Sequence, residues 1–371
     1  MKNNQSKIDL PAVPTAQVGK LISELCPNGV EFKELGEVCT VLRGKRLTKK
    51  ELSDDGDYPV FHGGLIPLGR YGKFNRKANQ TMVINTGSVG EVVWSNVDFW
   101  SSDGTFVVET PDNVDDKYLY YFLKTQEPYL KMQKREGGVP TIDRQAVAKI
   151  KIPLPPLAIQ EEIVEILNSF TELEAELEAE LEARRKQYEY YRKDLMLSYN
   201  GEHKTLDDIY DFQYGEGNTI PTTGGKYPVY GGNRLAGQHD KYNSEDAPVI
   251  GHIGAYAGIV NWVNGKHFVT YNGVICKIKA GVNHRFGYHL LVLQDFRSKA
   301  NAGSQPFVSY DMLKKTMIKI PDISIQNKIA DTLDKFDLLL SDISIGLPAE
   351  LKARRQQYEY YRGKLLTFKQ K

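Results

Sequence analysis

The sequence ARRKQYEYYR, residues Ala183–Arg192, occurs again almost unchanged as ARRQQYEYYR, residues Ala353–Arg362. Only Lys186 and Gln356 differ between the two copies. A near repeat about 170 residues apart indicates a duplicated structural unit. The chain is therefore predicted to contain two similar units, each followed by a charged helix. That arrangement suits binding at two positions along one polymer better than it suits chemistry at a single centre.

Weaker matches precede the two helices in the same order. LGEVCTVLRG, Leu35–Gly44, aligns with LDDIYDFQYG, Leu206–Gly215, and predicts a strand followed by a turn. MVINTGSVGEVVW, Met82–Trp94, aligns with PVIGHIGAYAGIVNW, Pro248–Trp262, and predicts a β-hairpin with an exposed tip. Further matches are the turns Ser102-Asp103-Gly104 and Tyr271-Asn272-Gly273, the helical stretches Tyr118–Lys134 and Phe286–Lys299, and the closing segments Ile150–Pro153 and Ile318–Pro321. Strands and helices in this mixture indicate an α+β fold.

Each unit is followed by apolar residues at spacings of three and four, which predicts a long helix that packs on another helix. The predicted seam consists of Ile163, Phe170, Leu177, Tyr188, Tyr191 and Leu195 in the first helix and Ile329, Phe336, Tyr358 and Leu365 in the second. The tetrapeptide ELEA is repeated in tandem between Glu172 and Ala183, as expected of a helical spacer. Gly346 and Pro348 predict an interruption of the second helix. The expected boundaries are an N-terminal extension at 1–28, units at 29–156 and 201–321, and helices at 157–200 and 322–371.

Composition limits the function classes. Apolar residues make up 41% and charged residues 26% of the chain, and the net charge is +1, so any affinity for a polyanion must come from local patches. Three cysteines without CxxC spacing indicate neither a disulfide framework nor a zinc site. No segment has the length and hydrophobicity of a signal peptide or membrane helix, so we expect a cytoplasmic protein with no membrane partner.

The two ARRxQYEYYRxxL helices, together with IPLPPLAIQEEIVEIL at Ile152–Leu167 and IPDISIQNKIADTL at Ile320–Leu333, resemble the specificity subunits of type I restriction-modification systems. The resemblance covers nearly the whole chain. It implies two target recognition domains that each read part of a split, asymmetric DNA sequence, and two helices that form an antiparallel coiled coil. It also implies binding to two modification subunits, which methylate adenine, and to two restriction subunits. The second helix departs from the first by four additional residues before Ala353.

Motifs for catalysis are missing from the sequence. A base methyltransferase needs a glycine-rich cofactor loop and a motif that holds the flipped base, and a translocase needs GxxxxGK[ST]. Gly224-Gly225-Lys226-Tyr227 lacks the required spacing. His284 and His289 are close in sequence, but no acidic or cysteine partner is evident, so no metal site is predicted. The chain is predicted to be non-catalytic and to hold no cofactor, with S-adenosylmethionine, ATP and magnesium expected on the partner subunits.

Candidate DNA-binding residues lie in basic loops and near the hairpin tips, where side chains can reach phosphates or base edges. In the first unit they are Arg43, Lys45, Arg46, His62, Arg70, Lys73, Arg76, Thr86, Ser88 and Arg135. In the second unit they are Gln213, Tyr214, Asn233, Arg234, His252, Tyr256, Ser304 and Gln305. A solvated charged face and plain turn-forming glycines are the alternatives. Arg43 opposite Tyr214 and Arg135 opposite Asn301 indicate that the two units read different half-sites.

Other functions fit parts of this pattern. A stand-alone DNA-binding regulator on the same scaffold would lack partner enzymes, and genes for modification and restriction subunits beside this one would argue against it. A complete methyltransferase would bind S-adenosylmethionine without partners. Arg184 and Arg185 of the helix either contact a modification subunit or pair with nearby glutamates such as Glu180 and Glu189.

Overall fold

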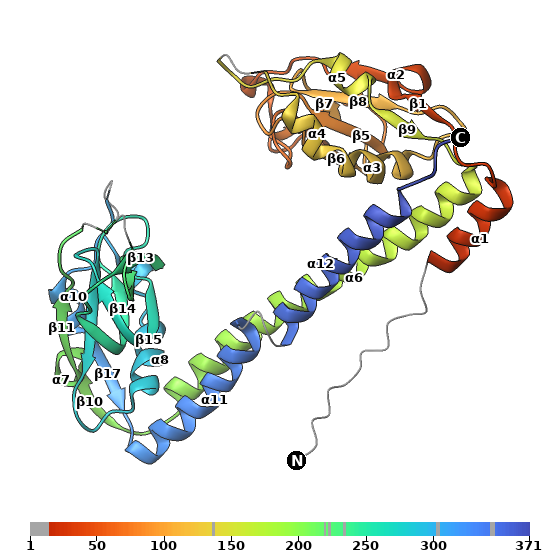
Figure 1. The fold of residues 1–371 in the computed structure, drawn as a ribbon. Coiled ribbons are helices and arrows are strands. Elements are labelled where there is room, and N and C mark those ends of the chain that lie inside the picture. The colour runs from red at the N-terminus through yellow and green to blue at the C-terminus, as the bar shows by residue number, and fades with distance from the viewer. Residues whose placement is uncertain are drawn as a thin grey trace. The chain divides into compact units, whose positions relative to one another are not determined.

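A computed structural model describes residues 15–135, 138–218, 220–221, 224–232, 235–301, 305–341 and 346–371 (Figure 1). The chain forms two compact units. Unit 1 comprises Met1–Glu176 together with Leu351–Lys371, and unit 2 comprises Leu177–Glu350. The boundary falls inside the 41-residue helix α6, Leu157–Leu197, so each unit contains one part of this helix. Both units combine sheets with helices in separate segments, and the fold class is α+β, as predicted.

Unit 1 is built on three antiparallel or mixed sheets. Their orders are β2-β8-β5-β6, β4-β3-β7 and β1-β9. The strands are β1 Phe32–Glu34, β2 Thr40–Arg43, β3 Tyr58–Phe61, β4 Gly69–Tyr71, β5 Gln80–Ile84, β6 Val92–Ser95, β7 Trp100–Ser101, β8 Thr105–Glu109 and β9 Lys151–Pro153. The helices are α1 Thr15–Leu25, α2 Leu35–Val38, η1 Lys49–Glu51, α3 Asp116–Thr125, α4 Glu127–Met132 and α5 Arg144–Ala148.

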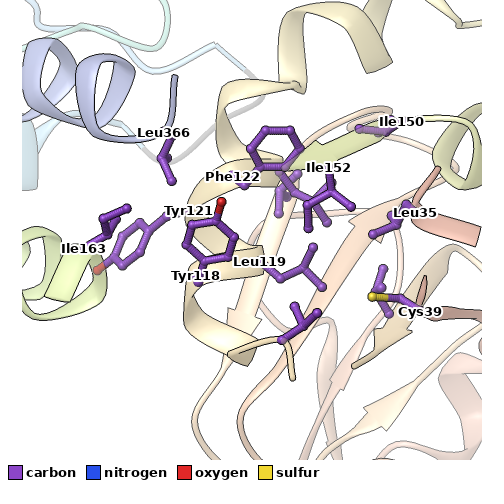
Figure 2. Close-up of a cluster of buried hydrophobic side chains, with 14 of the residues drawn as sticks. Leu35, Cys39, Tyr118, Leu119, Tyr121, Phe122, Ile150, Ile152, Ile163 and Leu366 are labelled. Carbon is purple, nitrogen blue, oxygen red and sulfur yellow. The ribbon is translucent and has the colours of Figure 1, made fainter. Parts of the chain in front are cut away.

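The central strand β5 is covered on both faces. Because side chains alternate along a strand, Val83 joins one hydrophobic cluster while Met82 and Ile84 join another. The larger cluster contains Tyr118 and Leu119 of α3 (Figure 2). Asp115 caps α3 by accepting hydrogen bonds from the backbone N–H groups of residues 117 and 118. This packing fixes the hairpin β5–β6, which the sequence predicted.

Unit 2 repeats the plan with a larger sheet of order β11-β16-β14-β15-β12-β13 and a separate pair β10-β17. The strands are β10 Glu202–Thr205, β11 Tyr210–Tyr214, β12 Tyr227–Tyr230, β13 Leu235–His239, β14 Ser244–Gly251, β15 Val260–Val269, β16 Gly273–Ile278 and β17 Met317–Ile320. The helices are α7 Leu206–Ile209, α8 His284–Leu293, α9 Phe296–Lys299 and α10 Tyr310–Lys315. Val249 and Ile250 of β14 point into different clusters, so this strand is also buried on both faces.

The long helices pack antiparallel within each unit. In unit 1, Phe170 of α6 stacks on Tyr361 of α12, Gly346–Leu365, with ring centroids 5.5 Å apart. Arg355 Nε bonds Glu174 Oε1 at 2.5 Å in the same interface. In unit 2, Tyr188 of α6 lies against Phe336 of α11, Ile323–Ser341, at 5.9 Å. Figure 1 shows α12 beside the first part of α6 and α11 beside the last part.

Most predicted seam residues face these interfaces. Buried or half-buried positions are Ile163, Phe170, Leu177, Tyr188, Leu195, Ile329, Tyr358 and Leu365. Phe336 is 37% exposed but still contacts Tyr188. Tyr191 is 43% exposed and borders a hollow that Tyr188 and Phe336 also line, so it lies at the exposed edge of the seam. Leu195, one helical turn further on, packs against the hydrophobic core of unit 2.

The second helix is interrupted where Gly346 was expected to interrupt it. α11 ends at Ser341, and α12 begins at Gly346, which has a φ of +63°. That left-handed backbone favours glycine because a side chain would clash with the following carbonyl. Pro348 lies in the first turn of α12, where its missing N–H costs no helical hydrogen bond. The glycine therefore marks the interruption, and the proline is compatible with the new helix.

Hydrogen bonds establish which positions of the two units correspond. Gly44 N donates to Thr105 O, and Gly215 N donates to Gly273 O. Thr105 therefore corresponds to Gly273, which aligns Asp103 with Tyr271. The sequence alignment of this turn, which paired the two Asx-Gly steps, was wrong by one residue. Gly104 and Gly273 both follow an Asx residue in the turn, but they occupy positions that differ by one residue. The register is set by hydrogen bonds to distant segments and not by the local composition of the turn.

Candidate nucleic-acid interface

Unit 1 has a groove at the ends of its strands. One hollow is lined by Arg43, Thr86, Arg135 and Arg144, among others, and an adjoining hollow by Arg43, Thr86, Arg46 and His62. Arg43 and Thr86 border both hollows, so the two are continuous. We refer to this surface as the unit 1 groove. It brings together five residues predicted from the sequence: Arg43, Arg46, His62, Thr86 and Arg135.

Backbone carbonyls hold two arginines of the groove, Arg43 and Arg144. Arg43 is the last residue of β2, where it pairs with Phe106 of β8, and it donates from Nε to Asp103 O at 3.3 Å. Asn85 Nδ2 donates to the same carbonyl at 3.1 Å. Arg144, the first residue of α5, donates from Nη1 to Val41 O at 3.4 Å. Each bond uses one of the five N–H donors of an arginine, so the other donors of each guanidinium remain able to bind a ligand.

Carboxylates lie within the groove and give it both signs of charge. Arg135 Nη2 bonds Asp143 Oδ2 at 3.0 Å, and His62 Nδ1 lies 3.5 Å from Asp103 Oδ1. Lys45 and Arg46 are exposed on the loop after β2. The indole N–H of Trp100 donates to Lys45 O at 2.8 Å and fixes the path of this loop. Cationic donors and carboxylate acceptors therefore lie next to one another in the groove, and recognition of polar base edges requires both kinds of group.

Five predicted residues of unit 1, Lys45 among them, are not part of the groove lining. Arg70 donates to Gly56 O and Asp57 O at 2.5 and 2.6 Å and so secures a loop. Arg76 is half-buried and pairs with Glu109 at 3.5 Å. Lys73 and Ser88 are exposed. For the two arginines, the structure shows an architectural role that basic composition by itself does not reveal.

Unit 2 has aromatic rings at the matching place. Tyr214 stacks on Tyr310 with centroids 3.9 Å apart and an interplanar angle of 9°. His252 lies 4.4 Å from Tyr214, and Tyr271 lies 5.5 Å from His252. We refer to these four side chains as the unit 2 aromatic cluster. Tyr271 is 46% exposed, whereas His252 is 8% exposed, so the cluster has an open side and a buried base.

The aromatic cluster carries no formal charge near neutral pH. Burial lowers the pKa of His252, although a hydrogen bond with the backbone of Tyr271 opposes this shift. Burial chiefly raises the pKa of Tyr310 to about 12 and also raises that of Tyr214. All three groups are therefore neutral in the physiological range. The cluster differs in this respect from the unit 1 groove, whose arginines stay charged.

The remaining predictions for unit 2 have varied positions. Gln213 donates to Asp211 at 2.9 Å, Tyr256 is 51% exposed, and Gln305 is exposed. Asn233, Arg234 and Ser304 lie outside the described residues. The predicted hairpin tips are only partly exposed, because Asn85 and His252 at their first positions are 3% and 8% exposed. These two side chains turn inward because the next segments pair with their backbones: Ile142 N donates to Asn85 O, and Val308 N to His252 O.

Sequence reasoning missed several residues of these surfaces. They are Asp103 and Arg144 in unit 1 and Tyr271 and Tyr310 in unit 2. Arg144 and Tyr310 each follow a helix N-cap, Asp143 and Ser309, whose side chains accept from the first-turn backbone. The paired caps are a sequence signal that places both residues at the first position of a short helix. Their proximity to Arg43 and Tyr214 is a tertiary property.

The prediction that His289 has no acidic partner was wrong. His289 Nε2 lies 2.9 Å from Asp334 Oδ1, and Asp337 completes a group with metal-ligand spacing. Arg285 already occupies the position of a cation, because its Nε donates to both oxygens of Asp334 and its Nη2 lies 3.5 Å from Asp337. Asp334 and Asp337 are separated from His289 by about 45 residues of sequence, and for that reason the spacing carried no signal. The cluster joins α8 to α11.

Comparison with known proteins agrees with this architecture. The family model described as the type I restriction modification DNA specificity domain matches residues 27–183 and 200–353. The chain belongs to this family. It is 30% identical over 398 residues to a type I restriction enzyme specificity subunit of Escherichia coli, with 91% of this chain and 94% of that protein covered. It is 28% identical over 374 residues to a putative specificity subunit of Haemophilus influenzae, with 91% and 96% covered.

Solved structures support the fold. The S subunit of a type I restriction-modification system from M. genitalium matches with a TM-score of 0.59 and 21% identity, covering 92% of this chain and 97% of that one. A chain from a structure of type I restriction-modification assembly matches with a TM-score of 0.60 and 15% identity, covering 92% and 98%. As a member of this family, the chain is a non-catalytic specificity subunit that binds DNA, and catalytic activity resides on partner subunits. Across the described residues, every helix is too short or too polar to cross a membrane.

Proposed function

We propose that the chain reads a bipartite, asymmetric DNA target, with one half-site bound by each unit, and directs adenine methylation and restriction by partner subunits to that target. The observation that carries this proposal is the pair of matched surfaces. The unit 1 groove and the unit 2 aromatic cluster occupy corresponding positions of a duplicated scaffold but present different chemistry. Two identical surfaces would suit a symmetric target, whereas two different ones suit an asymmetric target.

The partners we propose are two modification subunits, with S-adenosylmethionine, and two restriction subunits, with ATP and magnesium. Duplication of the scaffold supports a pairwise stoichiometry, because each unit repeats the same packing of sheet on helix. Gln160 donates to Pro155 O at 2.8 Å in unit 1, and Gln326 donates to Pro321 O at 2.8 Å in unit 2. A protein that recognises one unit through this shared framework finds the same framework in the other.

We further propose that α6 sets the number of unspecified bases between the half-sites. Its 41 residues correspond to roughly 60 Å of helix at ~1.5 Å per residue. The tandem ELEA segment lies within it and can change by whole units without loss of helix propensity.

A domain exchange tests the proposal. Residues 205–320 are replaced by the corresponding segment of a relative, and methylated adenines are mapped after expression with modification subunits. One half of the methylated sequence should change and the other half should remain. A simultaneous change of both halves would contradict independent reading. The unexchanged chain serves as the control, and methylation by the purified chain without partners would contradict the assignment of chemistry to those partners.

A further inference from the structure

Four positions of unit 1 correspond one by one to four positions of unit 2, and the backbone shows the correspondence. Asn85 N donates to Gly104 O, as His252 N donates to Asn272 O. This pair aligns Asn85 with His252 and, one residue earlier, Asp103 with Tyr271. The register of β2 with β8 and of β11 with β16 aligns Arg43 with Tyr214 in the same way.

The fourth pair lies at the start of a short helix. Thr86 forms an isolated β-bridge with Thr141 in unit 1, and Ile253 forms one with Phe307 in unit 2. Thr141 and Phe307 each lie two residues before the N-cap of a short helix, Asp143 in unit 1 and Ser309 in unit 2. Arg144 therefore corresponds to Tyr310. The four matched positions, which we call the reading quartet, come from a strand end, a hairpin tip, a turn and a helix start.

The quartets differ in chemistry although their scaffolds agree. In unit 1 the quartet is Arg43, Asn85, Asp103 and Arg144, which offers two cationic forks and a carboxylate, while the buried amide of Asn85 holds the backbone of Asp103. In unit 2 it is Tyr214, His252, Tyr271 and Tyr310, which offers aromatic faces and hydroxyl groups. No position retains its chemical type. Residues that only support the fold would not need to change together at all four positions, because the backbone bonds that they flank are the same.

Base edges distinguish these two kinds of side chain. An arginine fork matches O6 and N7 of guanine, and a carboxylate accepts from N4 of the paired cytosine. An uncharged aromatic surface matches the methyl group of thymine. Resting on the function proposed above, we propose that the reading quartet of unit 1 selects a G·C pair in its half-site and that the reading quartet of unit 2 selects an A·T pair in the other.

The test is a binding selection from DNA with randomised half-sites, using the full chain in complex with its modification subunits. Exchange of residues 205–320 identifies which half belongs to unit 2. Arg43→Gln and Arg144→Gln, tested singly, should each reduce discrimination for the G·C pair about tenfold and leave the other half unchanged. Tyr271→Ala should reduce the A·T preference of the unit 2 half only. These three side chains are exposed, so the variants are expected to fold, and thermal unfolding verifies this.

Lys149→Gln is the matched control for Arg144→Gln, because Lys149 is an exposed cation at the opposite end of α5 and should leave selectivity unchanged. A unit 1 half-site without a G·C pair, or folded arginine variants with unaltered preference, would overturn the inference. A uniform loss of affinity on all sequences would also overturn it, since that result marks phosphate contacts. If the wild-type complex selects no split sequence, the proposed bipartite function itself fails, which is a separate result.

Discussion

The two units use the same backbone bonds to hold different side chains, and the difference extends beyond the reading quartets. In unit 1, Tyr121 of α3 donates to Asn168 of α6 at 2.7 Å. In unit 2, the corresponding contact joins His289 to Asp334 at 2.9 Å, and Arg285 adds a forked ion pair. At the same junction between two helices, unit 1 therefore has a neutral hydrogen bond and unit 2 has a charged network. Beside this junction, each of the two helices also places a leucine in the hydrophobic core of its unit, Leu119 in α3 and Leu290 in α8.

The largest effect is expected from changing α6 between Glu172 and Ala183. One extra ELEA lengthens a continuous helix by ~6 Å and rotates the residues after the insertion by about 40° beyond a full turn. Bases rise ~3.4 Å each, so the unspecified gap should grow by one or two base pairs while both half-sites persist. A two-residue insertion rotates the apolar seam by roughly 200° and should abolish assembly or activity. Mapping the methylated sites of each variant measures the gap between the half-sites. An unchanged gap after the four-residue insertion would mean that α6 does not set the spacing.

The junction between two helices, α3 with α6 in unit 1 and α8 with α11 in unit 2, offers the next largest effect. Asp334→Ala leaves His289 without its acceptor and removes the shorter ion pair of Arg285, and it should destabilise unit 2 by about 2 kcal/mol, whereas Asn168→Ala should cost unit 1 about 1 kcal/mol. Amide hydrogen exchange resolves the two units and measures both values. Equal losses of stability would show that the charged network stabilises unit 2 no more than the neutral hydrogen bond stabilises unit 1.

The same junction should make unit 2 more sensitive to acid. Burial acts to raise the pKa of Asp334, but hydrogen bonds from His289 and Arg285 and the charge of Arg285 outweigh it and leave this pKa below its ordinary value. Folding therefore favours the ionised carboxylate, and its contribution is complete above about pH 4 and is lost as pH falls through the native pKa. The stability difference between wild type and Asp334→Asn should shrink below about pH 4.

Salt dependence provides a smaller contrast between the binding surfaces. Replacing Lys45 and Arg46 by alanine should flatten the dependence of log affinity on log salt by about 0.9 for each phosphate contact that the substitutions remove. Tyr271→Ala should weaken binding without changing the slope, because an aromatic contact releases no counterions. Affinity titrations between 50 and 200 mM salt, roughly the range where the effect is large, compare the two. An unchanged slope for the lysine and arginine variant would indicate a solvated loop.

The smallest effect is expected on the repeated helix motif. Arg184 pairs with Glu180 of its own helix at 3.3 Å, and both side chains are about half exposed. Arg184→Ala should change the free energy of unfolding by at most about 0.5 kcal/mol. Arg355 bonds Glu174 across the helix interface, and Arg355→Ala should cost about 1 kcal/mol. Urea unfolding of both variants measures the difference; a large loss for Arg184→Ala would point to a role in packing.

Local patterns in the sequence predicted much of the fold. Apolar spacing predicted α6, and alternating β-branched residues with glycines predicted the hairpins β5–β6 and β14–β15. Local patterns failed where register mattered. The turn of Asp103 was aligned one residue out of step, and Tyr191 was placed in the core of the seam, whereas it lies at the exposed edge. In both cases a residue type fits two neighbouring positions equally well, and only pairing with a distant segment distinguishes them.

The sequence by itself determined the duplication, the helices after each unit, the family and the lack of catalytic motifs, because periodicity, capping and repeated residues are properties of neighbouring positions. Tertiary structure alone decided which loop residues form a surface. Arg144 lines the same hollow as Arg43, about a hundred residues away in the sequence, because Ile142 N bonds Asn85 O and the Nη1 of Arg144 bonds Val41 O. Arg70, by contrast, is directed to its own loop. Contacts of this kind depend on strand register and on the path of distant loops, so the composition and residue spacing of the sequence do not predict them.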